Sequence, residues 1–202
     1  MKLYYSAASC SLASNITLHE AGIAYDLTKV DLAAHKTEDG ADFYAIHDKG
    51  YVPYLVLDNG EGLSEGAAIL QYIADQKPEA NLAPKAGTME RYRLQEWLTY
   101  INSEVHKPMG SMFNPDIHAE TRAQTIVNVG KRLDWLSKKL AGKTYLLGDT
   151  FTVADAYLFT VLNWGQWVGV EIAKWPVLAA FMGRVSARPK VQEALKKVGL
   201  VK

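Results

Sequence analysis

The one cysteine of the chain, Cys10, lies in the segment SAASCSLASN, where an apolar stretch gives way to a segment typical of a helix. Helix N-terminal amides and the positive end of the helix dipole lower the pKa of a thiol from its usual ~8.5, which favours a reactive thiolate. The alternative is an inert, packed side chain, because cysteine is among the most buried residue types. No second cysteine is present, so disulfide chemistry at Cys10 needs an external thiol.

Three further motifs combine residue types that bind or react. Val52-Pro53 lies in the apolar run YVPYLVL, and because proline removes a ladder hydrogen bond, an edge strand beginning at Tyr54 is one interpretation. Ser64-Glu65-Gly66 precedes a predicted helix, whose first amides suit a carboxylate, while a buried acid there suits an ammonium group. An acid that merely complements the helix dipole is the alternative.

His106 is the third candidate, beside Lys107 and before Pro108. The sequence predicts a helix over 89–107, which places His106 at its end. There the side chain either favours the C-terminal dipole or serves a site, and the sequence alone supports both interpretations equally.

Composition narrows the classes of partner. Lys and Arg number 22, as do Asp and Glu, so no overall charge favours nucleic acid or an anionic membrane, and a small partner is expected. The histidine spacing and the single cysteine predict no metal site, and the chain has neither a phosphate-loop motif nor a dinucleotide fingerprint. No signal peptide or apolar run of roughly 18 residues occurs, so we expect a cytoplasmic protein.

The elements that would position these residues form two groups. Residues 1–5 and 24–30 read as strands around a helix over 11–21 that Gly22 ends, which is a βαβ unit. A strand over 51–57, the hairpin signal Asn59-Gly60 and a helix over 66–76, capped by Ser64, add a ββα unit. Residues 81–88 are linker-like.

Everything after the linker is predicted to be helical. An apolar stripe indicates a helix through 126–140 that Gly142 ends. Thr152 and Asp155 fit a capping box, Pro176 begins another helix, and Pro189 begins a last one. The fold class is therefore an α/β domain of βαβ-ββα order, at 1–80, followed by an all-α domain at 88–202.

The order of these motifs resembles the glutathione transferases, whose N-terminal domain is thioredoxin-like. The segment FTVADAY over 151–157 is similar to the capped buried helix of that family, and Cys10 with His106-Lys107 resembles the bacterial beta class. The resemblance covers essentially the whole chain. It implies a homodimer with glutathione as co-substrate and no permanently bound cofactor.

The resemblance also implies the site residues. It makes Cys10 and His106 the catalytic candidates and a cis Val52-Pro53 bond a feature of the glutathione site. The implied glutathione-binding residues are Cys10, His35, Val52, Pro53, Glu65, Gly66, Thr99, Ser103, Glu104, Val105 and His106. Tyr5 and Lys107 are candidates for the electrophile pocket, and no metal ligand is implied. His35, with Lys36 beside it, and Thr99 replace the lysine and asparagine common in the family.

The implied function is conjugation of the glutathione thiolate to small hydrophobic electrophiles. Two questions stay open at this point. Either Cys10 or a hydroxyl group of Tyr5, Ser6, Ser9 or Ser11 activates glutathione. The alternative function is a glutathione-dependent thiol reductase or dehalogenase, in which Cys10 forms a mixed disulfide. A non-enzymatic binder with the same fold ranks last, because the site residues are all present.

Overall fold

The computed structural model describes residues 1–201, which form two compact units. One unit contains Met1–Ala80 together with the chain from Arg188 onward, and the other contains Asn81–Ala187. The expected domain boundaries at 80 and 88 stay a prediction, while the last helix packs with the first unit.

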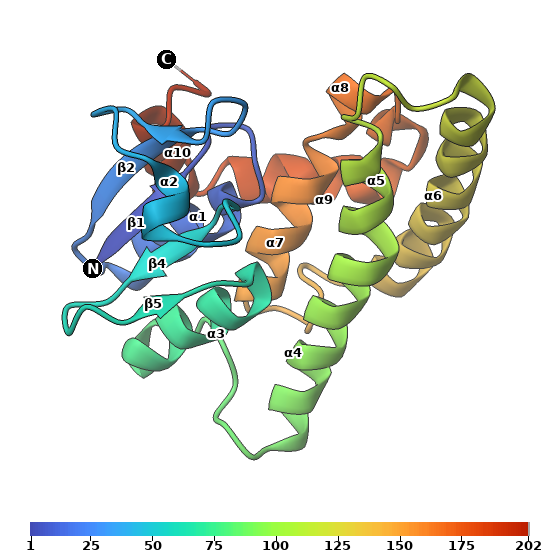
Figure 1. Ribbon diagram of the computed structural model, residues 1–202. Helices are drawn as coiled ribbons and strands as arrows, with labels where there is room; N and C mark the ends of the chain where they lie inside the picture. Colours follow the sequence, from blue (N-terminus) through green and yellow to red (C-terminus); the bar gives the residue numbers. More distant parts are fainter. Residues whose placement is uncertain (202) are drawn as a thin grey trace. The chain divides into compact units, whose positions relative to one another are not determined.

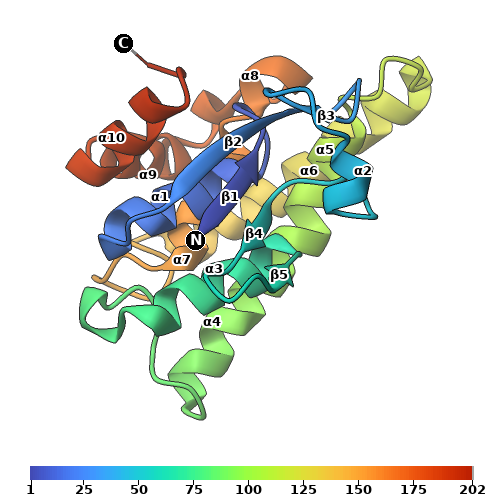
Figure 2. The same cartoon turned by 60° about the vertical axis from the view of Figure 1, so that its left-hand side comes forward.

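The first unit is built on a five-stranded sheet of order β3-β2-β1-β4-β5 in the described residues (Figure 2). Its strands are β1 (Lys2–Tyr5), β2 (Asp26–Asp31), β3 (Lys36–Thr37), β4 (Tyr54–Val56) and β5 (Gly62–Leu63). β1 pairs in parallel with β2 and antiparallel with β4, and the outer pairs are antiparallel. β4 begins directly after Pro53 but has neighbours on both sides, so it is not the edge strand that a proline suggests.

Helices cover both faces of this sheet. α2 (Phe43–Ile46) lies in front of the sheet in Figure 1 and α1 (Ser11–Ala21) behind it. Side chains of β1 alternate accordingly: Tyr4 packs with Phe43 on the α2 face, whereas the neighbouring side chain, the fully buried Leu3, points to the opposite face. α3 (Gly66–Gln76) and α10 (Pro189–Lys197) pack against α1.

Most sequence-based elements of this unit are confirmed, with three additions. α1 and α3 have the predicted bounds, and Gly22 ends α1 in a left-handed conformation with φ 65°. β3 and α2 lie between the strands predicted over 24–30 and 51–57; they were not predicted because they are too short to show a repeating apolar pattern. A short turn of 3-10 helix, η1 (Pro78–Ala80), follows α3.

The second unit is helical. Its elements are α4 (Met89–Tyr100), the π-helix η2 (Ile101–His106), α5 (Lys107–Ser111), α6 (Ala119–Leu140), α7 (Val153–Leu162), α8 (Gly165–Val168), η3 (Ile172–Lys174) and α9 (Pro176–Ser186). Every residue of α7 is buried, which makes it the centre of this unit. Asp155 accepts hydrogen bonds from the Thr152 amide and hydroxyl and from the Leu146 amide, so its carboxylate anchors the start of α7.

The expectation that Pro108 ends a helix is wrong. α4, η2 and α5 form one continuous column, drawn in green in Figure 1, and Pro108 lies in the first turn of α5. The Lys107 amide donates to the Asn102 carbonyl oxygen five residues back, as in a π-helix. The wider turn lets the helical path continue through a proline, which tolerates a first-turn position because it needs no amide there.

Candidate active site

The Cys10 thiol is held at the start of α1, in contact with the segment before β4. Cys10 occupies the N-cap position, and its Sγ atom lies 3.4 Å from the Val52 carbonyl oxygen, to which it donates. The Val52-Pro53 peptide bond is cis, which confirms that expectation. The side chain of Cys10 is half-buried and not in a disulfide. The thiol therefore meets both a helix N-terminus and the backbone of the cis-proline segment.

The serines around Cys10 hold one another in place. Ser9 Oγ and Ser11 Oγ lie 2.7 Å apart, and the Ser6 carbonyl oxygen lies 2.9 and 3.1 Å from them, so that one hydroxyl group donates to the other and the second donates to Ser6. Ser11 is fully buried, and its Oγ also accepts from the Ser6 amide. This network shapes the turn that leads into α1. The Ser9 and Ser11 hydroxyl groups are thus engaged as part of the backbone support.

Glu65 lies directly before α3 in an uncommon backbone conformation. Its φ is 68°, in the left-handed region, and Glu65 rather than the predicted Ser64 is the N-cap residue of α3. Its carboxylate accepts from Lys49 Nζ at 3.0 Å, and Lys49 also donates to Ser64 Oγ at 3.4 Å. The expectation of a buried acid is wrong, because the Glu65 side chain is 72% exposed. The carboxylate is open to a ligand.

Pro53 and Gly66 bring the two binding segments together. A Cβ atom added at Gly66 would lie 3.9 Å from Pro53 Cγ, so the first residue of α3 lies next to the proline ring. The first amides of a helix have no partner within the helix, which suits them to an anion. Cys10 thus adjoins Val52, and Pro53 adjoins Gly66, so these residues are contiguous in the first unit, with Val52 and Pro53 buried and Glu65 exposed.

His35 and Tyr5 complete the predicted residues of this unit. The His35 ring stacks on Tyr44 at 4.3 Å, and a Cβ added at Gly50 would lie 3.0 Å from His35 Nδ1, so His35 packs against the loop that contains Lys49 and Gly50. Tyr5 ends β1, and burial followed by the charge of Glu38 raises the pKa of its hydroxyl. Tyr5 is therefore a protonated hydrogen-bond donor at neutral pH.

His106 has a defined set of partners in the second unit. Its Nδ1 atom is hydrogen-bonded to the Tyr157 hydroxyl, and its ring contacts Trp164 edge to face, with centroids 4.9 Å apart. Burial, followed by the charge of Lys107, lowers the pKa of His106 to about 4. His106 is thus neutral at pH 7, and as the last residue of η2 it does not lie at the C-terminus of a helix as predicted.

The other candidates of this unit lie on the same column of helix. Thr99 accepts at its backbone oxygen from Ser103 Oγ, 3.1 Å away, and Val105 is fully buried, so its side chain is inaccessible. Glu104 forms an ion pair with Arg132 of α6. Lys107 is exposed at the start of α5. Glu104 and Arg132 also line a cavity of about 410 Å³ between this column and α6.

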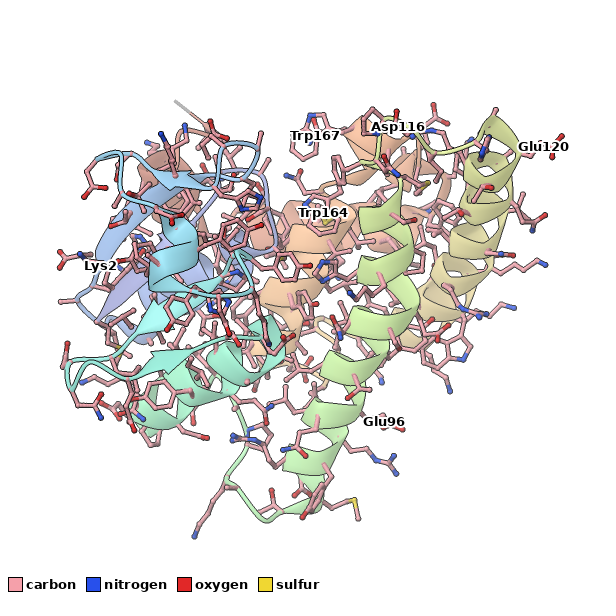
Figure 3. All side chains as sticks on the ribbon, in the orientation of Figure 1. Lys2, Glu96, Asp116, Glu120, Trp164 and Trp167 are labelled. Atoms are coloured by element: carbon pink, nitrogen blue, oxygen red, sulfur yellow. The ribbon has the colours of Figure 1, made fainter. Side chains whose placement is uncertain are left out.

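The predicted residues thus gather in two sets, one in each unit. Three supporting residues were missed from the sequence: Lys49, which pairs with Glu65, and Asn102 and Tyr157, which form a hydrogen-bonded group with His106. Tyr157 lies within the FTVADAY motif, but its partner is 51 residues away, so no local signal connects them. Figure 3 shows Trp164, which contacts His106, and Trp167 on the neighbouring α8.

Residues 1–201 contain neither a metal-binding cluster of side chains nor a membrane-spanning helix. No group of three or more His, Cys, Asp or Glu side chains is arranged there to hold a metal ion. None of the helices in that range combines the length and the apolar character needed to cross a membrane.

Comparison with known proteins identifies the family to which this chain belongs. Residues 8–76 match the model of the glutathione S-transferase N-terminal domain, and residues 96–189 match that of the C-terminal domain. The chain is 42% identical to the glutathione S-transferase GstA of Escherichia coli O157:H7 over 200 residues, covering 99% of this chain and 100% of GstA. It belongs to the glutathione S-transferase family. The expected family and fold class are therefore confirmed.

Solved structures of glutathione S-transferases have the same fold as this chain. The beta-class glutathione S-transferase of Sphingomonas chungbukensis has a TM-score of 0.96 and 47% identity, covering 100% of both chains. A sphingomonad glutathione S-transferase solved in complex with glutathione has a TM-score of 0.95 and 45% identity, again over 100% of both chains. The expected beta class and the enzyme class, glutathione transferase, are confirmed by these relatives.

Proposed function

We propose that this glutathione transferase adds the glutathione thiolate to small hydrophobic electrophiles, as a homodimer in the cytoplasm. The observation that carries this proposal is the contact between Cys10 Sγ and the Val52 carbonyl oxygen at the cis Val52-Pro53 bond. It places the one thiol of the chain at a helix start, beside backbone groups that can pair with a peptide. A tripeptide with its own thiol fits those surroundings.

The chemistry of glutathione matches the first unit group by group. Its γ-glutamyl end carries an ammonium and a carboxylate, for which the exposed Glu65 carboxylate and the Gly66 amide are suitable partners. Its cysteinyl backbone would pair with the amide and carbonyl of Val52, next to Pro53. Its glycyl carboxylate would lie near His35 or Lys36. These contacts hold the glutathione sulfur beside Cys10.

Activation of glutathione then requires a group that stabilises a thiolate. The Ser9 and Ser11 hydroxyl groups bond each other and the Ser6 carbonyl oxygen, which makes them less suited than Cys10 or Tyr5. Cys10 would act at the helix start, where positive potential favours thiolate, and Tyr5 would act as a hydrogen-bond donor. Holding the thiolate next to the electrophile is the catalytic contribution we propose.

The second unit would supply the electrophile pocket and part of the dimer interface. This assignment follows the domain division at 1–80 and 88–202. Lys107, with Tyr5 of the first unit, would contact the electrophile, and His106 would stabilise the thiolate or contact glutathione. The resemblance to the beta class implies that Thr99, Ser103, Glu104 and Val105 contribute to glutathione contacts, including those across the dimer; because the Val105 side chain is buried, its contact would involve the backbone.

Calorimetric titration with glutathione tests this function. Glu65→Ala removes a charge-assisted hydrogen bond of roughly 1.5–3 kcal/mol, so we expect affinity to fall about 10–100-fold. Glu61→Ala is the matched control, because Glu61 is an exposed acid of the same unit that contacts Asn59 instead. Absence of glutathione binding by the unmodified protein would overturn the proposed function.

The thiol reductase or dehalogenase alternative gains no additional support from the relatives described above. Cys10→Ala separates the two activities. A reductase that forms a mixed disulfide at Cys10 loses all activity in this variant, whereas conjugation continues at a reduced rate if Tyr5 activates glutathione. Steady-state rates with a disulfide substrate and with an aromatic electrophile make the comparison.

A further inference from the structure

The Tyr157 hydroxyl group connects two side chains of the π-helix. Tyr157, on the buried helix α7, is 3% exposed. Its Oη atom donates to Asn102 Oδ1 at 3.0 Å and is also hydrogen-bonded to His106 Nδ1. Asn102 and His106 both belong to η2, so one hydroxyl group of α7 holds both ends of this turn.

The number of protons in this group fixes the state of His106. A tyrosine hydroxyl has one proton to donate, and here that proton goes to Asn102 Oδ1. The bond to His106 must then run the other way, with Nδ1–H donating to the Tyr157 oxygen. A neutral imidazole carries one proton, so its Nε2 atom keeps a lone pair and is an acceptor.

The surroundings of the ring fix its orientation and its charge. Tyr157 and Trp164 both meet the His106 ring edge to face, at interplanar angles of 86° and 76°. Gly110 lies beside the ring, since a Cβ added there would be in ordinary contact with His106 Cδ2, at 3.7 Å. Lys107 is the charged group that acts on the ring, and with burial it lowers the His106 pKa to about 4. The imidazolium form is therefore disfavoured at neutral pH.

We propose that Asn102 and Tyr157 are positioning residues that hold His106 as the Nδ1–H tautomer, so that its Nε2 atom accepts a hydrogen bond from an N–H group of glutathione. This inference rests on the proposed function. It selects one of the two roles considered for His106: a neutral acceptor orients glutathione, whereas stabilising a thiolate would need a donor or a cation.

Long-range ¹H–¹⁵N correlation spectra of the full protein, labelled at histidine, test the tautomer. His106→Gln assigns the signal by its disappearance. We expect the unmodified protein to show a protonated Nδ1 and an unprotonated Nε2. In Asn102→Leu the Tyr157 proton is released to bond Nδ1, so the tautomer should reverse, whereas Asn102→Asp keeps an acceptor and should preserve it. A protonated Nε2 in the unmodified protein, or no change in Asn102→Leu, would overturn the inference.

Two further variants distinguish the effect of the Tyr157 hydroxyl group on the His106 tautomer from a general effect of removing a tyrosine hydroxyl group. Tyr157→Phe keeps the ring and removes the hydroxyl, so it should mix the two tautomers of His106. Tyr100→Phe is the matched control, because the Tyr100 hydroxyl donates to the Arg132 carbonyl oxygen instead. The His106 tautomer in that variant should match that of the unmodified protein.

Calorimetric titration of the same variants with glutathione connects the tautomer to binding. Because Nε2–H would oppose an N–H donor, we expect Asn102→Leu to bind glutathione about tenfold more weakly, and Asn102→Asp to stay within about twofold of the unmodified protein. Undiminished binding by a variant with the reversed tautomer overturns this inference alone. Failure of the unmodified protein to bind glutathione overturns the proposed function and this role with it.

Discussion

Cys10 and Val52 are 42 residues apart in the chain, yet the Cys10 thiol donates to the Val52 carbonyl oxygen at 3.4 Å. The contact joins the start of α1 to the cis Val52-Pro53 segment before β4. A parallel β1–β2 pair and an antiparallel β1–β4 pair bring the two segments to the same end of the sheet. The relationship between these two residues is therefore a product of sheet topology.

The position of Cys10 predicts a lowered thiol pKa. The N-terminal end of α1 favours the thiolate, so the pH dependence of thiol alkylation should have its midpoint below ~8.5. The same chain unfolded in denaturant provides the control, with a midpoint near the ordinary value. A folded-state midpoint at or above ~8.5 would show that the S–H bond to Val52 outweighs the helix terminus.

Asp155 predicts a large loss of stability on truncation. The side chain is fully buried and accepts from the Leu146 amide and from the Thr152 amide and hydroxyl. Asp155→Ala leaves these buried donors without an acceptor, so the free energy of unfolding in urea should fall by about 2–4 kcal/mol. Asp149→Ala is the control, since Asp149 is exposed and accepts from Thr144 Oγ1; its loss should stay below about 1 kcal/mol. Equal losses in the two variants would contradict this role.

Asp155 also predicts a pH dependence of stability. Burial raises the pKa of Asp155 to about 6, so the folded protein binds this proton more tightly than the unfolded chain. The stabilisation from protonation is complete below the unfolded pKa of ~3.8 and is lost as pH rises through about 6, a change on the order of 3 kcal/mol. Asp155→Asn cannot titrate. As the pH rises from about 4 to 7, the free energy of unfolding of the wild type should therefore fall relative to that of this variant. A difference between the two that stays constant with pH would contradict the raised pKa.

The parts of the fold that could be predicted from the sequence are those set by single residues or short motifs. Gly22, Asn59-Gly60 and Pro189 act through the conformation of their own backbone, and the end of α1, the β4–β5 hairpin and the start of α10 were predicted correctly. The strand predicted over 51–57 is shorter in the structure, because β4 covers only Tyr54–Val56. Pro108 was misleading, because the π-helix that accommodates it depends on hydrogen bonds over five residues rather than on residue type.

In the candidate site, too, residue positions could be predicted from the sequence, whereas contacts between distant residues could not. Cys10, Pro53 and Glu65 were recognised from their residue types and places in the pattern together with the resemblance to the glutathione transferases, since the pattern alone left an inert alternative for each. The exposure of Glu65, its ion pair with Lys49 and its left-handed φ before α3 are features that the sequence does not specify. The contacts of His106 with Tyr157 and Trp164 come from helices packed in space, so only the structure shows that His106 is neutral.

A crystal structure of the protein grown with glutathione tests the central claim most directly. The account predicts the glutathione sulfur bonded to Cys10 Sγ or in contact with it, the cysteinyl backbone paired with Val52, and the γ-glutamyl end at Glu65 and the Gly66 amide. Glutathione bound elsewhere, or with its sulfur away from both Cys10 and Tyr5, would contradict it.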